Sequence, residues 1–142
     1  MSEESTTHDR EELVRRSIEA FDRRDWDLDA VMRLFAPDVV WDIPVGLGTY
    51  EGAAAVREFI ESWWATWEDH HHYVEEMRDF GHGVVCMALR EDGRLVGSST
   101  PFQRRNVGVF EWAHGQVVRV TWFGGRCEAR AAAERLAQER GG

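Results

Sequence analysis

Hydrophobic positions follow two different periods, and the change divides the chain into a helical first part and a β-rich second part. Apolar residues first recur every three or four positions, which predicts helices after Asp9, after Asp27 or Asp29, and after Gly52. The later period of two predicts strands, and Ala- and Arg-rich residues 128–136 predict a closing helix. The predicted strands are 73–80, 84–90, 96–112 and 117–123.

The third predicted helix has a wide aromatic face that extends to Trp67. The three histidines that follow it, residues 70–72, are interpreted as its solvated end. Three adjacent histidines cannot all reach one ion from a regular element, so no metal site is predicted there. Further along, Asp92-Gly93 predicts a type I′ hairpin turn between two strands.

A short apolar strand, residues 39–41, is predicted between the second and third helices. Pro37 ends the helix before it, and Pro44 with Gly46 ends the strand. Asp42 therefore stands where the strand leaves the core. Its carboxylate either acts as a general base in an apolar setting or caps the following loop.

Composition places the chain among ordinary one-domain proteins. Its 142 residues are expected to form a flexible tail over 1–8 and a single domain over 9–140. A net charge of −9, without a basic stripe, argues against nucleic acid as a partner. The lack of a long apolar run argues against a membrane span and favours a cytoplasmic protein. Cys86 and Cys127 are expected to be free thiols.

Three stretches carry a resemblance to a known superfamily: residues 34–42 (LFAPDVVWD), 50–52 (YEG) and 115–123 (GQVVRVTWF). Together with the order of elements, they resemble nuclear transport factor 2-like proteins, in particular the SnoaL-like polyketide cyclase and ketosteroid isomerase-like branch. The resemblance implies an α+β cone, in which a curved, mostly antiparallel sheet packs on N-terminal helices. It also implies a homodimer paired through the outer sheet face, with no metal or organic cofactor.

Residue by residue, the resemblance supports one catalytic position. Asp42 matches the strand-end aspartate that shuttles protons in ketosteroid isomerases. The tyrosine and protonated aspartic acid that stabilise the dienolate in those enzymes correspond here to Ser17 and Gly108. The aspartate that serves the cyclases near the last strand is replaced by Gly124 and Gly125. A known isomerase or cyclase mechanism is therefore not expected.

Alternation along the strand containing Gly108 provides further pocket candidates. If Gly108 faces the pocket, Arg104, Asn106, Phe110 and Trp112 face it too, whereas Val107, Val109 and Glu111 face away. Arg104 and Asn106 are either ligand-binding groups or a solvated strand end, and Arg119 either pairs with an inner carboxylate or is exposed. The tryptophans either line the cavity or fill it. The remaining pocket candidates are Ser17, Trp41, Phe59, Trp63 and Phe123.

Two functions follow from these residues. The first is a cofactor-independent isomerase, cyclase or hydrolase in which Asp42 transfers a proton on a hydrophobic polycyclic or terpenoid-like molecule. The alternative is a module of the same fold that binds a small hydrophobic molecule, or assists a partner enzyme, without chemistry. The missing donors favour the alternative, and the retained Asp42 favours the enzyme.

Overall fold

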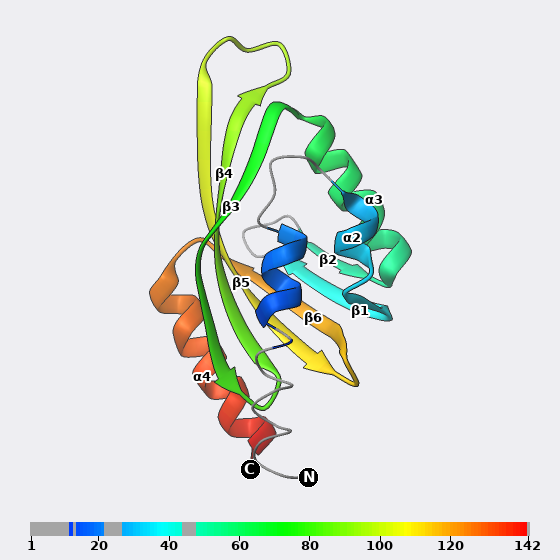
Figure 1. Cartoon of the computed structure of the whole chain (residues 1–142), viewed down its shortest axis with the longest axis vertical. Helices are drawn as coiled ribbons and strands as arrows, with labels where there is room; N and C mark the ends of the chain where they lie inside the picture. Colours follow the sequence, from blue (N-terminus) through cyan, green and yellow to red (C-terminus); the bar gives the residue numbers. More distant parts are fainter. Residues whose placement is uncertain (1–11, 13, 22–26, 44–47, 142) are drawn as a thin grey trace.

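Six strands form one curved sheet in the order β2-β1-β6-β5-β4-β3, in which only β1 and β6 are parallel (Figure 1). The computed structural model describes residues 12, 14–21, 27–43 and 48–141. Helices lie before and after the run of four consecutive antiparallel strands. The elements are α2 (Leu28–Met32), β1 (Phe35–Ile43), β2 (Gly48–Glu51), α3 (Ala53–Ala65), β3 (Trp67–Gly81), β4 (Val84–Leu95), β5 (Pro101–Ala113), β6 (Gln116–Phe123) and α4 (Arg126–Gly141).

The sheet separates two apolar cores. Helical residues 14–21, α2 and α3 pack on its inner face, whereas α4 packs on its outer face (Figure 1). The inner core is the larger and is rich in aromatic residues, including Phe21, Trp41, Phe110 and Trp122. This arrangement confirms the predicted α+β cone. Among the described helices, none is long and apolar enough to span a membrane.

Helix α2 begins as expected, but strand β1 begins earlier in the chain than the predicted strand 39–41. Asp27 caps α2 as predicted, because its carboxylate accepts a hydrogen bond from the backbone N–H of Ala30 at 3.0 Å. Strand β1 begins at Phe35, so Pro37 lies inside the strand and does not end a helix. A register irregularity between Phe35 and Val40 accommodates the proline. The predicted cap at Asp9 lies outside the described residues.

The histidine run belongs to a strand and not to the solvated end of a helix. Helix α3 ends at Ala65, and β3 begins two residues later. Asp69, with a positive φ of 52°, forms a bulge in which residues 69 and 70 together lie opposite Gly93. The bulge shifts the alternation of β3 by one residue, so His70 and His72 are buried.

Asp92-Gly93 continues a strand and does not form the predicted hairpin turn. Strand β4 runs through both residues to Leu95, and Gly93 pairs with Phe102 on β5. A Cβ atom on Gly93 would lie 2.9 Å from the carbonyl oxygen of Glu68 and 3.0 Å from the ring of Trp67. The glycine is therefore explained by the close approach of the bulged strand β3.

Helix α4 covers part of the outer sheet face with small side chains. Ala129, Ala133 and Ala137 pack on Val84, Cys86, Ala88, Val107 and Val109. Alanines allow the helix axis to lie close to the strands, because they add little bulk between the two layers. The outer face, through which pairing was expected, is thus partly occupied by the chain's own C-terminal helix, and a homodimer stays a prediction.

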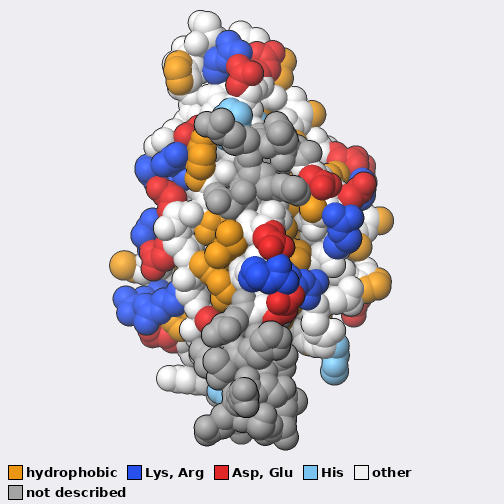
Figure 2. Space-filling model, viewed as in Figure 1, with side chains coloured by type: hydrophobic (Ala, Val, Ile, Leu, Met, Phe, Trp, Pro, Cys, Tyr) orange, Lys and Arg blue, Asp and Glu red, His pale blue; other side chains and the backbone are white. Residues whose placement is uncertain are grey.

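Charged side chains of both signs are interspersed on the face of the molecule seen in Figure 2. The long strands carry cross-strand ion pairs, such as Arg105 with Glu75 at 2.9 Å, and Arg126 of α4 pairs with Glu76 of β3 at 2.7 Å. Many of the described arginines pair with carboxylates, and the blue and red side chains alternate on this face (Figure 2).

The two cysteines are free, and they differ in burial. Burial under α4 raises the pKa of the Cys86 thiol to about 11, whereas Cys127 is exposed. The thiolate is the nucleophile, so we expect iodoacetamide at pH 8 to label Cys127 and leave Cys86 unmodified in the folded protein. Peptide mass spectrometry measures the two sites separately. Both should label in denaturant, and equal labelling of both in the native protein would contradict the burial of Cys86.

Candidate functional site

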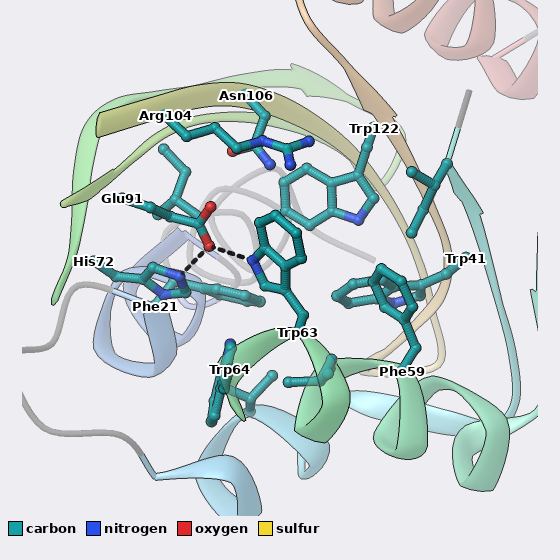
Figure 3. A pocket seen from close by; sticks show the side chains of 14 residues that line it. Phe21, Trp41, Phe59, Trp63, Trp64, His72, Glu91, Arg104, Asn106 and Trp122 are labelled. Carbon is teal, nitrogen blue, oxygen red and sulfur yellow. Dashed lines mark hydrogen bonds and ion pairs between the residues drawn. The ribbon is translucent and has the colours of Figure 1, made fainter. Parts of the chain in front are cut away.

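An aromatic cavity lies between the inner sheet face and the helices (Figure 3). Helix α3 supplies Phe59, Trp63 and Trp64, and the facing strands supply Trp41 and Trp122. The rings meet mostly edge to face, with centroids of Trp41 and Trp122 5.4 Å apart. The space among these side chains amounts to about 590 Å³ when the open solvent at its mouth is included, so the enclosed part is much smaller.

One end of the cavity is polar, and Glu91 lies at its centre. Its carboxylate oxygen Oε1 lies 2.8 Å from Nε2 of His72 and accepts a hydrogen bond from the indole N–H of Trp63 at 3.1 Å (Figure 3). Strand pairing places Glu91 directly opposite His72. A carboxylate only accepts hydrogen bonds, so Nε2 of His72 carries the hydrogen in this contact.

The pKa shifts of this pair indicate a carboxylate beside a neutral imidazole. Burial would raise the pKa of Glu91, but the N–H groups of His70, His72 and Trp63 outweigh it and hold the pKa at about 2. Burial lowers the pKa of His72, and the neighbouring carboxylate only partly opposes this. At neutral pH, the cavity therefore contains a stable buried anion.

Arg104 and Asn106 complete the polar end from strand β5. The guanidinium of Arg104 lies over the ring of Trp63, 4.8 Å from its centroid, and no ion pair joins Arg104 to Glu91 among the described residues. Oδ1 of Asn106 and Oε2 of Glu91 are both buried and have no hydrogen-bond partner within the described part of the chain. The polar end therefore combines a cation with two buried acceptors that lack a hydrogen-bond partner among the described residues.

Five of the predicted pocket residues line the cavity. Arg104 and Asn106 face inward together, as alternation from Gly108 predicted. The tryptophans partly line the cavity and partly fill the core, so both alternatives apply to different rings. The five lining residues are Trp41, Phe59, Trp63, Arg104 and Asn106.

Asp42 and Arg119 lie on the other face of the sheet, which corrects their expected place in the pocket. Trp41 and Ile43 line the cavity, so the alternation of β1 turns Asp42 outward. Its carboxylate accepts a hydrogen bond from the hydroxyl of Thr49 at 2.9 Å and forms an ion pair with Arg119. A proton-transfer role for Asp42 inside this cavity does not fit that position.

Four other predicted pocket residues pack elsewhere. Phe110 and Trp112 are buried in the inner core, and Ser17 is also buried without lining the cavity. Phe123 packs against the outer core beneath α4. A Cβ atom on Gly108 would lie 2.7 Å from Phe110 and 2.9 Å from Trp122, so these rings close the place where the isomerases have an acid.

His72 and Glu91, the two residues at the centre of the polar end, were not predicted from the sequence. The predicted third helix extended through Trp67, and the histidines after it were assigned to no strand. A signal was present, since His70 and His72 are two positions apart and Glu91 follows in the next strand. The register of the two strands, which depends on the bulge, was not visible in the sequence.

Comparisons with known proteins agree with this architecture. A family model described as a SnoaL-like domain matches residues 14–120. An NTF2-like protein of unknown function from Burkholderia pseudomallei is 26% identical, with 84% of this chain and 93% of that chain covered and a TM-score of 0.67. No curated protein sequence matches the chain.

Two further solved structures share the fold at lower identity. A putative SnoaL-like polyketide cyclase from Jannaschia sp. CCS1 is 18% identical and has a TM-score of 0.68. The match covers 91% of this chain and 93% of that chain. A phenazine biosynthesis-related protein from Pseudomonas aeruginosa is 12% identical, covers 94% and 92%, and has a TM-score of 0.72. The family match confirms the SnoaL-like resemblance drawn from the sequence, whereas these two likenesses, at such identities, concern the fold alone.

Proposed function

We propose that this chain, which belongs to the family of SnoaL-like domains, binds a small, flat, ring-containing molecule in the aromatic cavity. The molecule's oxygen-bearing end lies at Glu91, Arg104 and Asn106. The observation that carries the proposal is the pair of buried acceptors, Oε2 of Glu91 and Oδ1 of Asn106, at the end of an otherwise aromatic cavity. Buried polar atoms are costly without a partner, and a ligand hydroxyl would supply one.

The walls favour a flat ligand. The rings of Trp41, Phe59 and Trp122 present faces and edges to the cavity. A ligand ring that packs on them gains the free energy of apolar burial and, in addition, that of the ring–ring contacts. A fused aromatic ring system matches these walls better than a flexible aliphatic chain, because it loses less conformational entropy on binding.

The polar end favours a ligand that carries both a hydroxyl and an acidic group. The guanidinium of Arg104 presents donors to a carboxylate or enolate oxygen. Glu91 and Asn106 present acceptors to a neighbouring hydroxyl. A ring with adjacent acidic and hydroxyl groups would satisfy both sets of groups at once.

A second candidate function is proton transfer on the bound molecule. The observation that favours it is the hydrogen-bonded pair of His72 and Glu91, buried and lining the cavity. In this role the carboxylate orients the imidazole and His72 exchanges the proton. The three N–H groups around Oε1 make Glu91 itself a weak base, which favours binding without chemistry as the first candidate.

The first candidate predicts tight binding of 3-hydroxy-2-naphthoate and weaker binding of naphthalene, measured by isothermal titration calorimetry in the presence of EDTA. Arg104→Gln should weaken the hydroxynaphthoate by about 10-fold, because one charge-assisted contact is lost. The variant should leave naphthalene binding nearly unchanged.

Two matched variants control this experiment. Arg105→Gln changes the neighbouring arginine, which pairs with Glu75 outside the cavity, and should bind like the wild type. Asp42→Asn should also bind like the wild type, because Asp42 lies on the other sheet face. If the hydroxynaphthoate does not bind, or if Asp42→Asn weakens it as strongly as Arg104→Gln, the cavity assignment is wrong.

A further inference from the structure

Three buried side chains with metal-binding atoms meet beside the cavity: His70, His72 and Glu91. Their exposed fractions are only 2%, 4% and 4%. One ligand atom from each lies within 4.8 Å of the other two. The Nε2 atoms of His70 and His72 lie 3.5 and 2.8 Å from the same carboxylate oxygen. Three potential ligands therefore converge on one small volume.

The backbone holds this convergence in place. The bulge at Asp69 turns His70 and His72 to the same face of β3, and strand pairing sets Glu91 opposite His72. Ligands fixed on neighbouring strands need little rearrangement to meet one ion, unlike ligands on loops.

Aromatic neighbours support two of the three side chains. The ring of Trp67 stacks on His70 with a centroid distance of 4.4 Å and an interplanar angle of 6°. The indole N–H of Trp63 donates to Glu91. Outer contacts of this kind orient ligands in known metal sites.

The charge of Glu91 also points to a cation. Arg104, which pairs with Glu91 across the strands, stacks on Trp63 and forms no ion pair with the carboxylate in the described part of the chain. The contacts found for Oε1 are with imidazole and indole nitrogens, and Oε2 has no hydrogen-bond partner among the described residues. A buried carboxylate in such surroundings gains most from a bound positive ion.

We propose that His70, His72 and Glu91 bind one divalent transition-metal ion of the zinc, iron(II) or cobalt(II) class. Two imidazole nitrogens and one carboxylate oxygen form a donor set that these ions accept, while leaving coordination positions open. His72 and Glu91 also line the cavity, so the open positions face it. The bound ion would contact the oxygen-bearing end of a molecule in the cavity.

This site goes beyond the proposed function and does not rest on it, because the aromatic walls bind a ring with or without an ion. It also differs from the proton-transfer role. With an ion bound, His72 and Glu91 serve as ligands, and the ion polarises the oxygen of the bound molecule. The metal-free explanation is a cluster in which the imidazoles only hydrogen-bond to the carboxylate.

Cobalt(II) titration of the tag-free, EDTA-treated chain tests the proposal, followed by visible absorption and competition with zinc. We expect saturation at one ion per chain, with d–d bands of an ordered nitrogen and oxygen site. His70→Ala should weaken cobalt binding by about 100-fold, because one of three ligands is lost. His71→Ala changes the neighbouring imidazole outside the cluster and should bind cobalt like the wild type.

The possible outcomes are distinct. Absence of saturable binding would show a hydrogen-bonded cluster alone, and equal weakening in His70→Ala and His71→Ala would show non-specific binding by the histidine run. Circular dichroism confirms that each variant is folded, and Glu91→Gln provides a second loss of a ligand with little change in shape. The naphthoate titration in EDTA is independent, so failure of this site and failure of the proposed function are distinguishable.

Discussion

Replacing Ala133 with arginine should destabilise the protein by about 4 kcal/mol, the largest effect expected from a single substitution in α4. Ala133 is fully buried against the outer sheet face. An arginine there must either bury an unpaired charge or lift the helix from the strands, which exposes the valines beneath it. Urea unfolding followed by circular dichroism measures the loss.

Ala131→Arg is the matched control, because Ala131 lies on the exposed side of the same helix. It should change the free energy of unfolding by less than about 0.5 kcal/mol. Limited proteolysis separates the two ways in which Ala133→Arg can act, since a lifted helix is cleaved while the sheet stays folded. Equal stability of the two variants would mean that α4 does not pack on the sheet.

Glu91→Gln should remove a large part of the acid sensitivity of the fold. The pKa of Glu91 is held at about 2, against an ordinary value of 4.5, by neighbouring N–H groups that outweigh burial. A depressed pKa contributes stability above pH 4.5, and this stability is lost as the pH falls toward 2. The difference between these two pKa values corresponds to about 3 kcal/mol in the free energy of unfolding. Unfolding by urea between pH 7 and pH 2, with EDTA present, measures it.

His72 also makes the fold less stable as the pH falls, but over a higher pH range than Glu91. The two contributions can therefore be told apart. Burial lowers the pKa of His72, so the unfolded chain takes up its proton first as the pH falls below 6.5. Glu91→Gln removes the carboxylate that partly opposes this lowering, so the His72 part should persist or grow, whereas the part between pH 4.5 and pH 2 should be lost. The exposed Glu128 gives the control variant Glu128→Gln, which should keep the wild-type profile. An unchanged profile in Glu91→Gln would contradict the depressed pKa.

The sequence predicted the fold class and one wall of the site. Alternation along β5 placed Arg104 and Asn106 inward and Val107 and Val109 outward, because a regular strand turns successive side chains to opposite faces. The resemblance supplied the order of the elements, which the family match confirms. The first prediction succeeded because β5 is a regular strand, and the second because the sequence pattern is shared with the family.

The polar end of the cavity was not predicted, because it depends on irregularities of the backbone. The aromatic spacing of α3 continues to Trp67, so no residue pattern marks the end of the helix at Ala65. Asp42 was assigned by resemblance to a strand-end position, but the register of β1 decides which face it occupies. Glu91 becomes informative only when the pairing of β3 with β4 is known.

The bulge at Asp69 makes the identity of the cavity-facing histidines depend on backbone length and not only on side chains. Without it, strict alternation from Trp67 would turn Asp69 and His71 inward and carry His70 and His72 to the solvent side. Loss of residue 69 itself would restore alternation with His70 and His72 still inward. Two relatives with the same three histidines can therefore differ in which imidazoles they present, whereas a relative one residue shorter can keep the same pair.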